Sequence, residues 1–115
     1  MKKYILITGG SGFIGTNLVN YLVSKNYKVL NIDKKSYSST PEKFKKIKNK
    51  SNYKFLKIDL NNKKKVFSCI TKLKPKIIVH LAAETHVDRS IDNSEIFVKS
   101  NILGTYNLLC AFKKM

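Results

Sequence analysis

The chain has 115 residues, 43% of them hydrophobic and 10% aromatic, which is typical of one soluble globular domain and excludes a disordered segment. Its formal net charge of +16 comes from 23 lysine and arginine residues against 7 acidic ones, and Arg89 is the sole arginine. Because nucleic-acid sites usually combine arginine forks with aromatic stacking, we interpret the charge as a solvated lysine-rich surface and expect no nucleic-acid partner.

The first expected strand, residues 3–8, ends at a glycine cluster, and an expected helix over about residues 13–25 follows directly. A strand, a Gly-x-x-Gly-x-x-Gly turn and a helix form the context of a dinucleotide-binding loop. Gly9 allows a sharp turn, Gly12 allows a pyrophosphate to approach the backbone, and Gly15 allows the helix to pack close to the strand. We expect the phosphates at the positive end of the helix dipole. An ordinary tight turn is the alternative.

The second expected strand, residues 28–32, is closed by Asp33. Ligands of a parallel sheet bind at the carboxyl ends of its strands, so we expect the Asp33 carboxylate to accept hydrogen bonds from both hydroxyls of an adenosine ribose. The same charge repels a 2′-phosphate, which favours NAD over NADP as the cofactor. Lys34 and Lys35 could instead bind that phosphate, so NADP stays open, as does a turn or capping role for Asp33.

The middle of the chain predicts a short helix over about residues 41–48 and a third strand over residues 53–58. Asp59 and Leu60 follow this strand. By position we expect the carboxylate to bind the exocyclic amine of adenine and the leucine to cover the ring. A helix N-cap role for Asp59 or Asn61 is compatible with this expectation.

The last part of the chain predicts a helix over about residues 62–73, a fourth strand over residues 76–83, and a final helix that begins after residues 92–94 and continues to the end. Residues 77–81 are typical of a strand that is buried on both faces, with His80 packed inside it. Ala82 and Ala83 are small enough to let a cofactor lie against the backbone.

Other patterns limit the class of protein. No run of residues is long or apolar enough to span a membrane, and we expect no membrane partner. Cys69 and Cys110 form no Cys-x-x-Cys pattern, which indicates buried thiols in a reducing, cytoplasmic compartment. His80 and His86 have no thiolate or carboxylate at ligand spacing, so no metal site is expected.

The elements alternate as β-α-β-α-β-α-β-α. This order predicts an α/β fold with a Rossmann-like parallel sheet in the strand order 3-2-1-4, right-handed crossovers, and helices on both faces.

The segment of residues 8–15 (TGGSGFIG) resembles the signature of extended short-chain dehydrogenases/reductases. Within that group, residues 80–91 (HLAAETHVDRSI) closely resemble the corresponding segment of dTDP-glucose 4,6-dehydratases, as do residues 31–34 (NIDK) and 101–105 (NILGT). The resemblance covers the whole chain but only the N-terminal portion of such an enzyme. It implies an incomplete NAD-binding domain without its substrate domain, NAD as cofactor, dTDP-glucose as the substrate of the full-length enzyme, and a full-length homodimer.

The resemblance implies cofactor contacts along the whole carboxyl edge of the sheet: Phe13 and Ile14 at the pyrophosphate, Asp33, Lys34, Lys35 and Ser36 at the adenosine ribose, Asp59 and Leu60 at the adenine, and Leu81, Ala82, Ala83, Glu84, Thr85 and Ser100 along the nicotinamide half. It also implies contact of Thr85 with the sugar nucleotide. Lys35 stands where the family has an apolar residue. Thr85 stands where the family has serine, and Ser100 stands where it has threonine.

The chemistry of this family needs residues that the chain does not contain. NAD takes hydride from C4 of the sugar, water leaves across C5 and C6, and hydride returns to C6. The resemblance implies a tyrosine base whose pKa is lowered by a lysine four residues on, and an Asp-Glu pair for the elimination. We therefore assign no catalytic residue and expect the 115-residue chain to lack dehydratase activity by itself. We also expect its last helix and fourth strand to leave exposed surfaces.

The pattern Tyr-x-x-x-Lys does occur twice in the chain. Tyr53 and Lys57 fall on an expected strand, which separates them by about 13 Å along its axis. Tyr21 and Lys25 fall on the first expected helix, at the end away from the nucleotide crevice. Neither pair is therefore expected to be catalytic.

Two other functions stay open: another NAD-dependent sugar-nucleotide dehydratase or 4-epimerase, and a non-catalytic NAD-sensing module. Residues 80–91 favour the dehydratase. A sensor predicts tight binding of NAD and an enzyme fragment predicts weak binding, whereas a nucleic-acid module predicts strongly salt-dependent binding of DNA or RNA.

Overall fold

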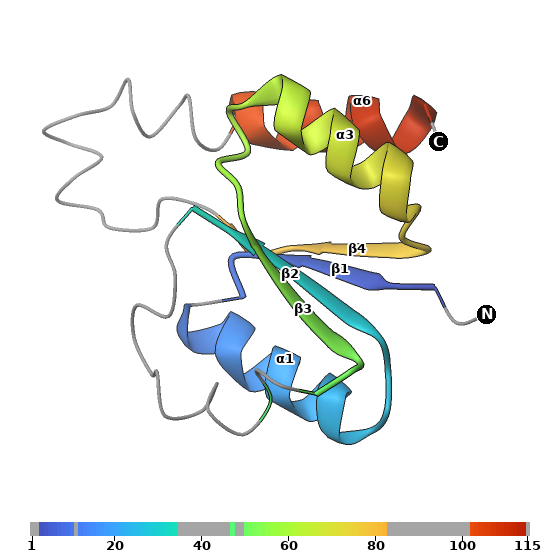
Figure 1. The fold of residues 1–115 in the computed structure, drawn as a ribbon. Helices are drawn as coiled ribbons and strands as arrows, with labels where there is room; N and C mark the ends of the chain where they lie inside the picture. The colour runs from blue at the N-terminus through green and yellow to red at the C-terminus, as the bar shows by residue number, and fades with distance from the viewer. Residues whose placement is uncertain (1–2, 11, 35–46, 48–49, 83–101, 115) are drawn as a thin grey trace, which may run out of the picture.

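A computed structural model of the chain describes residues 3–10, 12–34, 47, 50–82 and 102–114. Its elements are the strands β1 (Ile5–Thr8), β2 (Val29–Asp33), β3 (Tyr53–Lys57) and β4 (Ile77–His80), and the helices α1 (Phe13–Ser24), α3 (Lys63–Leu73) and α6 (Gly104–Lys114) (Figure 1). The expected helix over residues 41–48 lies outside this description except for Ile47, which is buried. None of the described helices is long and apolar enough to cross a bilayer.

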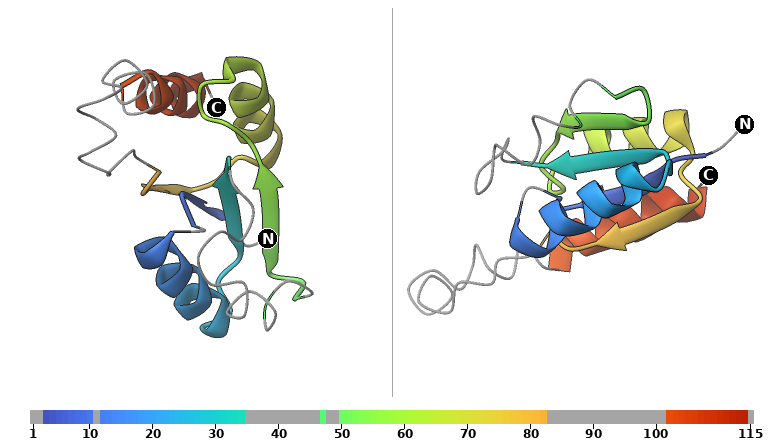
Figure 2. Two further views of the ribbon diagram at one scale, coloured as in Figure 1. Left: turned by 90° about the vertical axis from the view of Figure 1, so that its left-hand side faces the viewer. Right: turned by 90° about the horizontal axis from the view of Figure 1, so that it is seen from below.

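The four strands are parallel and lie in the order β3-β2-β1-β4, which confirms the predicted fold. Helix α1 covers one face of the sheet, and α3 and α6 lie side by side on the other (Figure 2). Because all strands run in the same direction, their carboxyl ends meet at one edge, beside the start of α1.

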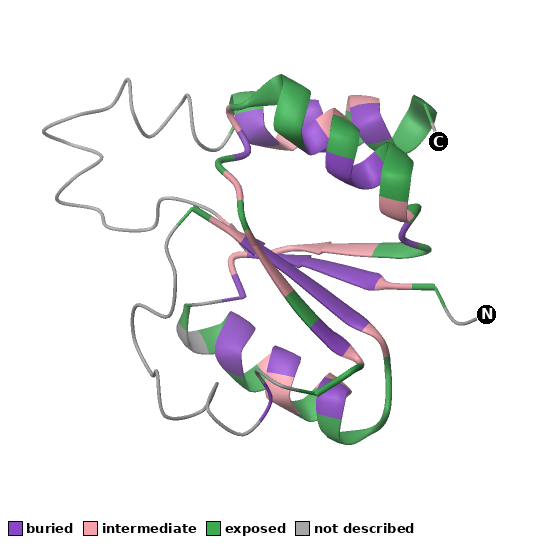
Figure 3. Cartoon of the chain, viewed as in Figure 1, coloured by how far each residue is buried: buried purple, intermediate pink, exposed green. Residues whose placement is uncertain are grey.

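Each face of the sheet has its own apolar layer. Strands β1 and β2 are buried along most of their length (Figure 3). The layer under α1 contains Ile5, Ile7, Val19, Val23 and Val29. The layer under α3 and α6 contains Leu6, Leu30, Ile32, Val66, Ile70 and Leu108. Successive side chains of a strand point to opposite faces, so the continuous apolar run of β1 supplies both layers.

Strand β4 differs from its prediction. It ends at His80 instead of residue 83, and it is only partly buried, with Ile77 46% exposed. Among the described strands β4 pairs with β1 alone, so it is an edge strand and one of its sides has no neighbour. The expected burial on both faces is therefore wrong for this structure. Cys69 is buried as expected, whereas Cys110 is only half-buried.

Asparagine residues lie at the end of α1 and at the start of α3. Asn26 has a φ of 66° just after α1, a left-handed conformation that asparagine tolerates. Asn62 caps α3, because its side chain accepts a hydrogen bond from the backbone N–H of Lys65 at 3.2 Å. The cap is thus neither Asp59 nor Asn61, the two residues that the sequence suggested.

Candidate dinucleotide-binding site

The turn between β1 and α1 is fixed to the carboxyl end of β2 by two hydrogen bonds. The backbone N–H of Gly9 donates to the carbonyl oxygen of Ile32 at 2.9 Å. The backbone N–H of Gly10 donates to Oδ1 of Asn31 at 3.0 Å. The glycine turn therefore lies directly beside the strand end that carries Asp33, as the spacing predicts.

Three glycines of the turn have different physical roles. Gly9 has a φ of +74°, and a Cβ there would lie 2.6 Å from the backbone nitrogen of Ala82. A Cβ on Gly15 would overlap the carbonyl oxygen of Gly9, so this glycine lets α1 approach the turn. Gly12 is exposed, and the nearest atom to a Cβ there is Gly9 O at 3.5 Å. Gly9 and Gly15 are thus required for packing, whereas Gly12 leaves an open surface.

The open surface at Gly12 lies at the start of α1. Gly12 is the N-cap residue, and within the described chain this end has no side-chain cap and no acidic residue in its first turn. The first N–H groups of a helix have no intrahelical acceptor and lie at the positive end of the helix dipole. This arrangement fits an anion such as a pyrophosphate. Ile14 is 68% exposed at the same end, and the side chain of Phe13 lies outside the described part.

Asn31 positions the glycine turn, a role that the sequence motifs did not predict. It is fully buried in the middle of β2, where its Oδ1 accepts from Gly10 and its Nδ2 donates to the hydroxyl oxygen of Tyr53 at 3.3 Å. Buried polar side chains need hydrogen-bond partners, and here the partner is the turn itself. An amide side chain inside an otherwise apolar strand (VLNID) is the signal that could have identified it.

The end of β4 is held by Thr8, the last residue of β1. The Thr8 hydroxyl oxygen accepts hydrogen bonds from the backbone N–H groups of Leu81, at 3.1 Å, and Ala82, at 3.2 Å. The same hydroxyl is hydrogen-bonded to Nδ1 of His80. Leu81 and Ala82 are consequently fixed against Gly9, where the sequence predicts the nicotinamide half of a cofactor.

These contacts determine the tautomer of His80. Both lone pairs of the Thr8 hydroxyl accept amide protons, so its own proton is donated to Nδ1 of His80. The ring proton must then be on Nε2, which donates to the hydroxyl oxygen of Thr105 in α6 at 2.8 Å. Burial also lowers the pKa of His80. His80 is therefore a neutral histidine that joins β1, β4 and α6.

Residues 59 and 60, at the end of β3, were expected to contact adenine. Asp59 is exposed, and its Oδ1 accepts the backbone N–H of Asn61 at 2.9 Å. Leu60 is only 8% exposed and packs in the core beneath α6, where its carbonyl oxygen accepts from Nδ2 of Asn107 at 2.8 Å. Gly104 permits this packing, because a Cβ there would lie 3.1 Å from Cβ of Leu60.

Ten described residues with an expected cofactor role lie at the carboxyl edge of the sheet or at the start of α1: Gly9, Gly12, Ile14, Gly15, Asp33, Lys34, Asp59, Leu60, Leu81 and Ala82. The remaining expected contacts lie outside the described residues: Lys35, Ser36, Ala83, Glu84, Thr85 and Ser100.

Neither Tyr-x-x-x-Lys pair has both of its residues at this edge. Tyr21 is exposed at the far end of α1, with Nζ of Lys25 5.7 Å from its ring centroid. Tyr53 is buried at the amino end of β3, and Lys57 is exposed at the carboxyl end of the same strand. Neither pair can act on a ligand bound at the glycine turn.

Comparisons with known proteins identify the family of the chain. A family model described as GDP-mannose 4,6 dehydratase matches residues 6–115. The chain is 44% identical over 105 residues to a probable dTDP-glucose 4,6-dehydratase of Sinorhizobium fredii, covering 91% of this chain and 30% of that protein. It is 42% identical over 106 residues to a dTDP-glucose 4,6-dehydratase of Haemophilus influenzae, covering 91% and 31%. The chain thus spans about 30% of the length of these curated relatives.

Two solved structures show the same fold. A dTDP-glucose 4,6-dehydratase from Bacillus anthracis in complex with NAD superposes with a TM-score of 0.79 at 35% identity, covering 97% of this chain and 34% of that one. A UDP-Glc/GlcNAc 4-epimerase from Campylobacter jejuni superposes with a TM-score of 0.86 at 26% identity, again covering 97% and 34%.

Proposed function

Because this chain belongs to the GDP-mannose 4,6 dehydratase family, we propose that it is the NAD-binding part of a dTDP-glucose 4,6-dehydratase. The observation that carries the proposal is the glycine turn, which presents the uncapped start of α1 next to Asp33. The identities of 44% and 42% to dTDP-glucose 4,6-dehydratases support the nucleotide sugar. The longer protein would convert dTDP-glucose to dTDP-4-keto-6-deoxyglucose.

The described residues fit an extended dinucleotide. The first N–H groups of α1 would hold the pyrophosphate, and Asp33 would accept hydrogen bonds from the adenosine ribose. Asp59 and the exposed part of Leu60 would contact the adenine. The backbone of Ala82, held by Thr8, would lie along the nicotinamide half. Bound NAD supplies a hydride acceptor, and the role of this chain is to bind it and fix its orientation.

Asp33→Asn tests the site directly. The variant keeps the size of the side chain but removes the charge that accepts ribose protons, so we expect NAD affinity to fall by about tenfold or more. We also expect the preference for NAD over NADP to narrow, because the repulsion of a 2′-phosphate is lost. Calorimetric titration of both variants with NAD and NADP measures this. Tighter binding of NADP than of NAD by the unsubstituted chain would contradict the assignment of Asp33.

A sugar-nucleotide 4-epimerase is the second candidate, favoured by the close superposition on the Campylobacter jejuni enzyme. Both activities require NAD at the same edge, so cofactor binding does not separate them. Product analysis of the longer protein with dTDP-glucose and with UDP-glucose does: a 4-keto-6-deoxy product supports the dehydratase, and a 4-epimer supports the alternative.

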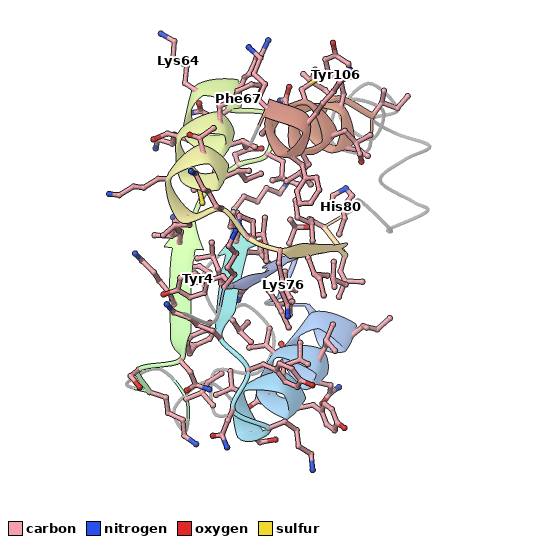
Figure 4. All side chains as sticks on the ribbon, turned by 90° about the vertical axis from the view of Figure 1, so that its right-hand side faces the viewer. Tyr4, Lys64, Phe67, Lys76, His80 and Tyr106 are labelled. Atoms are coloured by element: carbon pink, nitrogen blue, oxygen red, sulfur yellow. The ribbon has the colours of Figure 1, made fainter. Side chains whose placement is uncertain are left out.

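We further propose that the longer protein is a homodimer that buries an apolar face of α6. Its large exposed apolar side chains are Tyr106, Leu109 and Phe112, and Ile102 and Leu103 just before the helix are also exposed. Tyr106 points away from the sheet (Figure 4). Contiguous exposed apolar surface of this kind is typical of an interaction site.

Leu109→Lys is expected to reduce self-association without loss of fold, because Leu109 is 66% exposed. Sedimentation of the 115-residue chain at increasing concentration measures the association. Tyr21→Lys is the matched control, since Tyr21 is 56% exposed on α1, on the other side of the sheet. Equal association of the two variants would show that the α6 face is not the contact surface.

A further inference from the structure

A groove of about 380 Å³ lies between β3 and α3, apart from every residue assigned to the dinucleotide. Its lining residues come from these two elements and the position after β3: Lys54, Leu56, Ile58, Lys64, Lys65, Ser68, Cys69, Lys72 and Leu73. Its volume is in the range of small-molecule sites.

The groove has an apolar floor and a basic rim. Leu56, Ile58 and Leu73 are half-buried, and Cys69 is buried. The four lining lysines are exposed, one from β3 and three from α3; Lys64 extends from α3 into solvent (Figure 4). A ligand that lies on this floor would therefore have ammonium groups on both sides.

The described lining of the groove contains four lysines and no acidic residue. Among the described residues only Asp33 and Asp59 have carboxylate side chains, and neither of them lines the groove. The first turn of α3 contains Lys63, Lys64 and Lys65 and no acidic residue, although the dipole is already positive there. Like charges at this position repel each other, and a bound anion would relieve the repulsion.

The field of the rim reaches the floor. Burial raises the pKa of the Cys69 thiol, and the positive charge of Lys54 acts in the opposite direction. The Lys54 ammonium thus offsets part of the cost that burial imposes on a negative charge at Cys69.

We propose that this groove binds a small organic anion with an apolar body, of the amphiphilic carboxylate class. The floor would take the apolar body and the lysines the carboxylate. An inorganic anion would leave the apolar floor in water, and a cationic ligand would be repelled. No lining residue is an arginine or an aromatic residue, so the groove lacks the stacking and bidentate contacts that nucleic acids use.

Decanoate is a suitable probe, with decyltrimethylammonium as a cation of equal chain length. Methyl NMR of the 115-residue chain should show saturable shifts at Leu56, Ile58 and Leu73 with decanoate only. Raising NaCl from about 0.05 to about 0.5 M should weaken this binding, because the contacts are exposed charges. Equal binding of the cation, shifts confined to Ile102 and to Leu109 of α6, or no saturable binding would each overturn the proposal.

The double variant Lys54→Gln, Lys72→Gln tests the rim. We expect it to bind decanoate about tenfold more weakly, since it removes one ammonium from each wall. The double variant Lys3→Gln, Lys25→Gln is the matched control, because it lowers the net charge by the same amount at exposed lysines outside the groove. An equal loss of decanoate affinity in both double variants would mean that binding depends only on the net charge of the chain. That result would overturn the proposed site.

Discussion

A Gly9→Ala chain is expected to lose a large part of its folding stability. Gly9 has a φ of +74°, which costs a residue with a Cβ about 1–2 kcal/mol. The new Cβ would also lie 2.6 Å from the nitrogen and 2.7 Å from the Cα of Ala82. These are backbone atoms of the strand-end segment, and forcing them apart costs about 1–3 kcal/mol more. Together the two effects are a large share of the roughly 5–15 kcal/mol that stabilises a domain.

Urea unfolding followed by circular dichroism measures this loss as a lower midpoint at an unchanged slope. Gly12→Ala is the matched control. Gly12 has a φ of −79°, and the nearest atom to a Cβ there is 3.5 Å away, so the expected loss of stability is about 1 kcal/mol or less, because alanine is a poorer N-cap residue than glycine. Its methyl group would instead occupy the surface where a pyrophosphate approaches, and NAD should bind about tenfold more weakly. Equal urea midpoints for the Gly9→Ala and Gly12→Ala chains would contradict the steric role assigned to Gly9.

Periodicity and strand-end residues were sufficient to predict the sheet. The run of residues 3–8 and the glycines after it predicted β1, the turn and α1, because a glycine turn between an apolar strand and an amphipathic helix has few other solutions. The position of Asp33 beside the turn could also be predicted, because the carboxyl ends of parallel strands lie at one edge of the sheet.

The hydrogen bonds that hold the site could not be predicted in this way. Thr8 meets His80 because the two residues are register partners of β1 and β4, and register depends on the packing of both faces. Asn31 likewise reaches Gly10 only because β2 lies beside β1. The exposure of Ile77 agrees with the expectation, drawn from the family resemblance, that the fourth strand leaves an exposed surface. The apolar sequence of the strand alone predicted burial on both faces, because it does not show whether a neighbouring strand lies on each side.

Thr8→Val is expected to destabilise the chain by about 2–4 kcal/mol although the side chain keeps its shape. Thr8 is fully buried, and its hydroxyl accepts from Leu81 and Ala82 and donates to His80. Leu81 keeps the Thr8 carbonyl oxygen at 2.9 Å, but Ala82 N–H and His80 Nδ1 lose this partner. A buried polar group without a partner costs about 1–3 kcal/mol. Thr8→Ser retains the hydroxyl and loses one methyl group, so it should cost only about 1 kcal/mol.

The neutral state of His80 gives the same network a dependence on pH. Burial holds the pKa of folded His80 below its usual value, so the unfolded chain binds more protons as the pH falls. The contribution of His80 to folding stability is fully present above the pKa of His80 in the unfolded chain, about 6.5. It is lost as the pH falls through the lower pKa of His80 in the folded chain. His80→Gln should remove this contribution, so unfolding free energies of the two chains should converge as the pH falls below about 6.5. Parallel profiles between neutral and acidic pH would instead mean that folding does not lower the pKa of His80, and the neutral state assigned to the folded ring would be wrong.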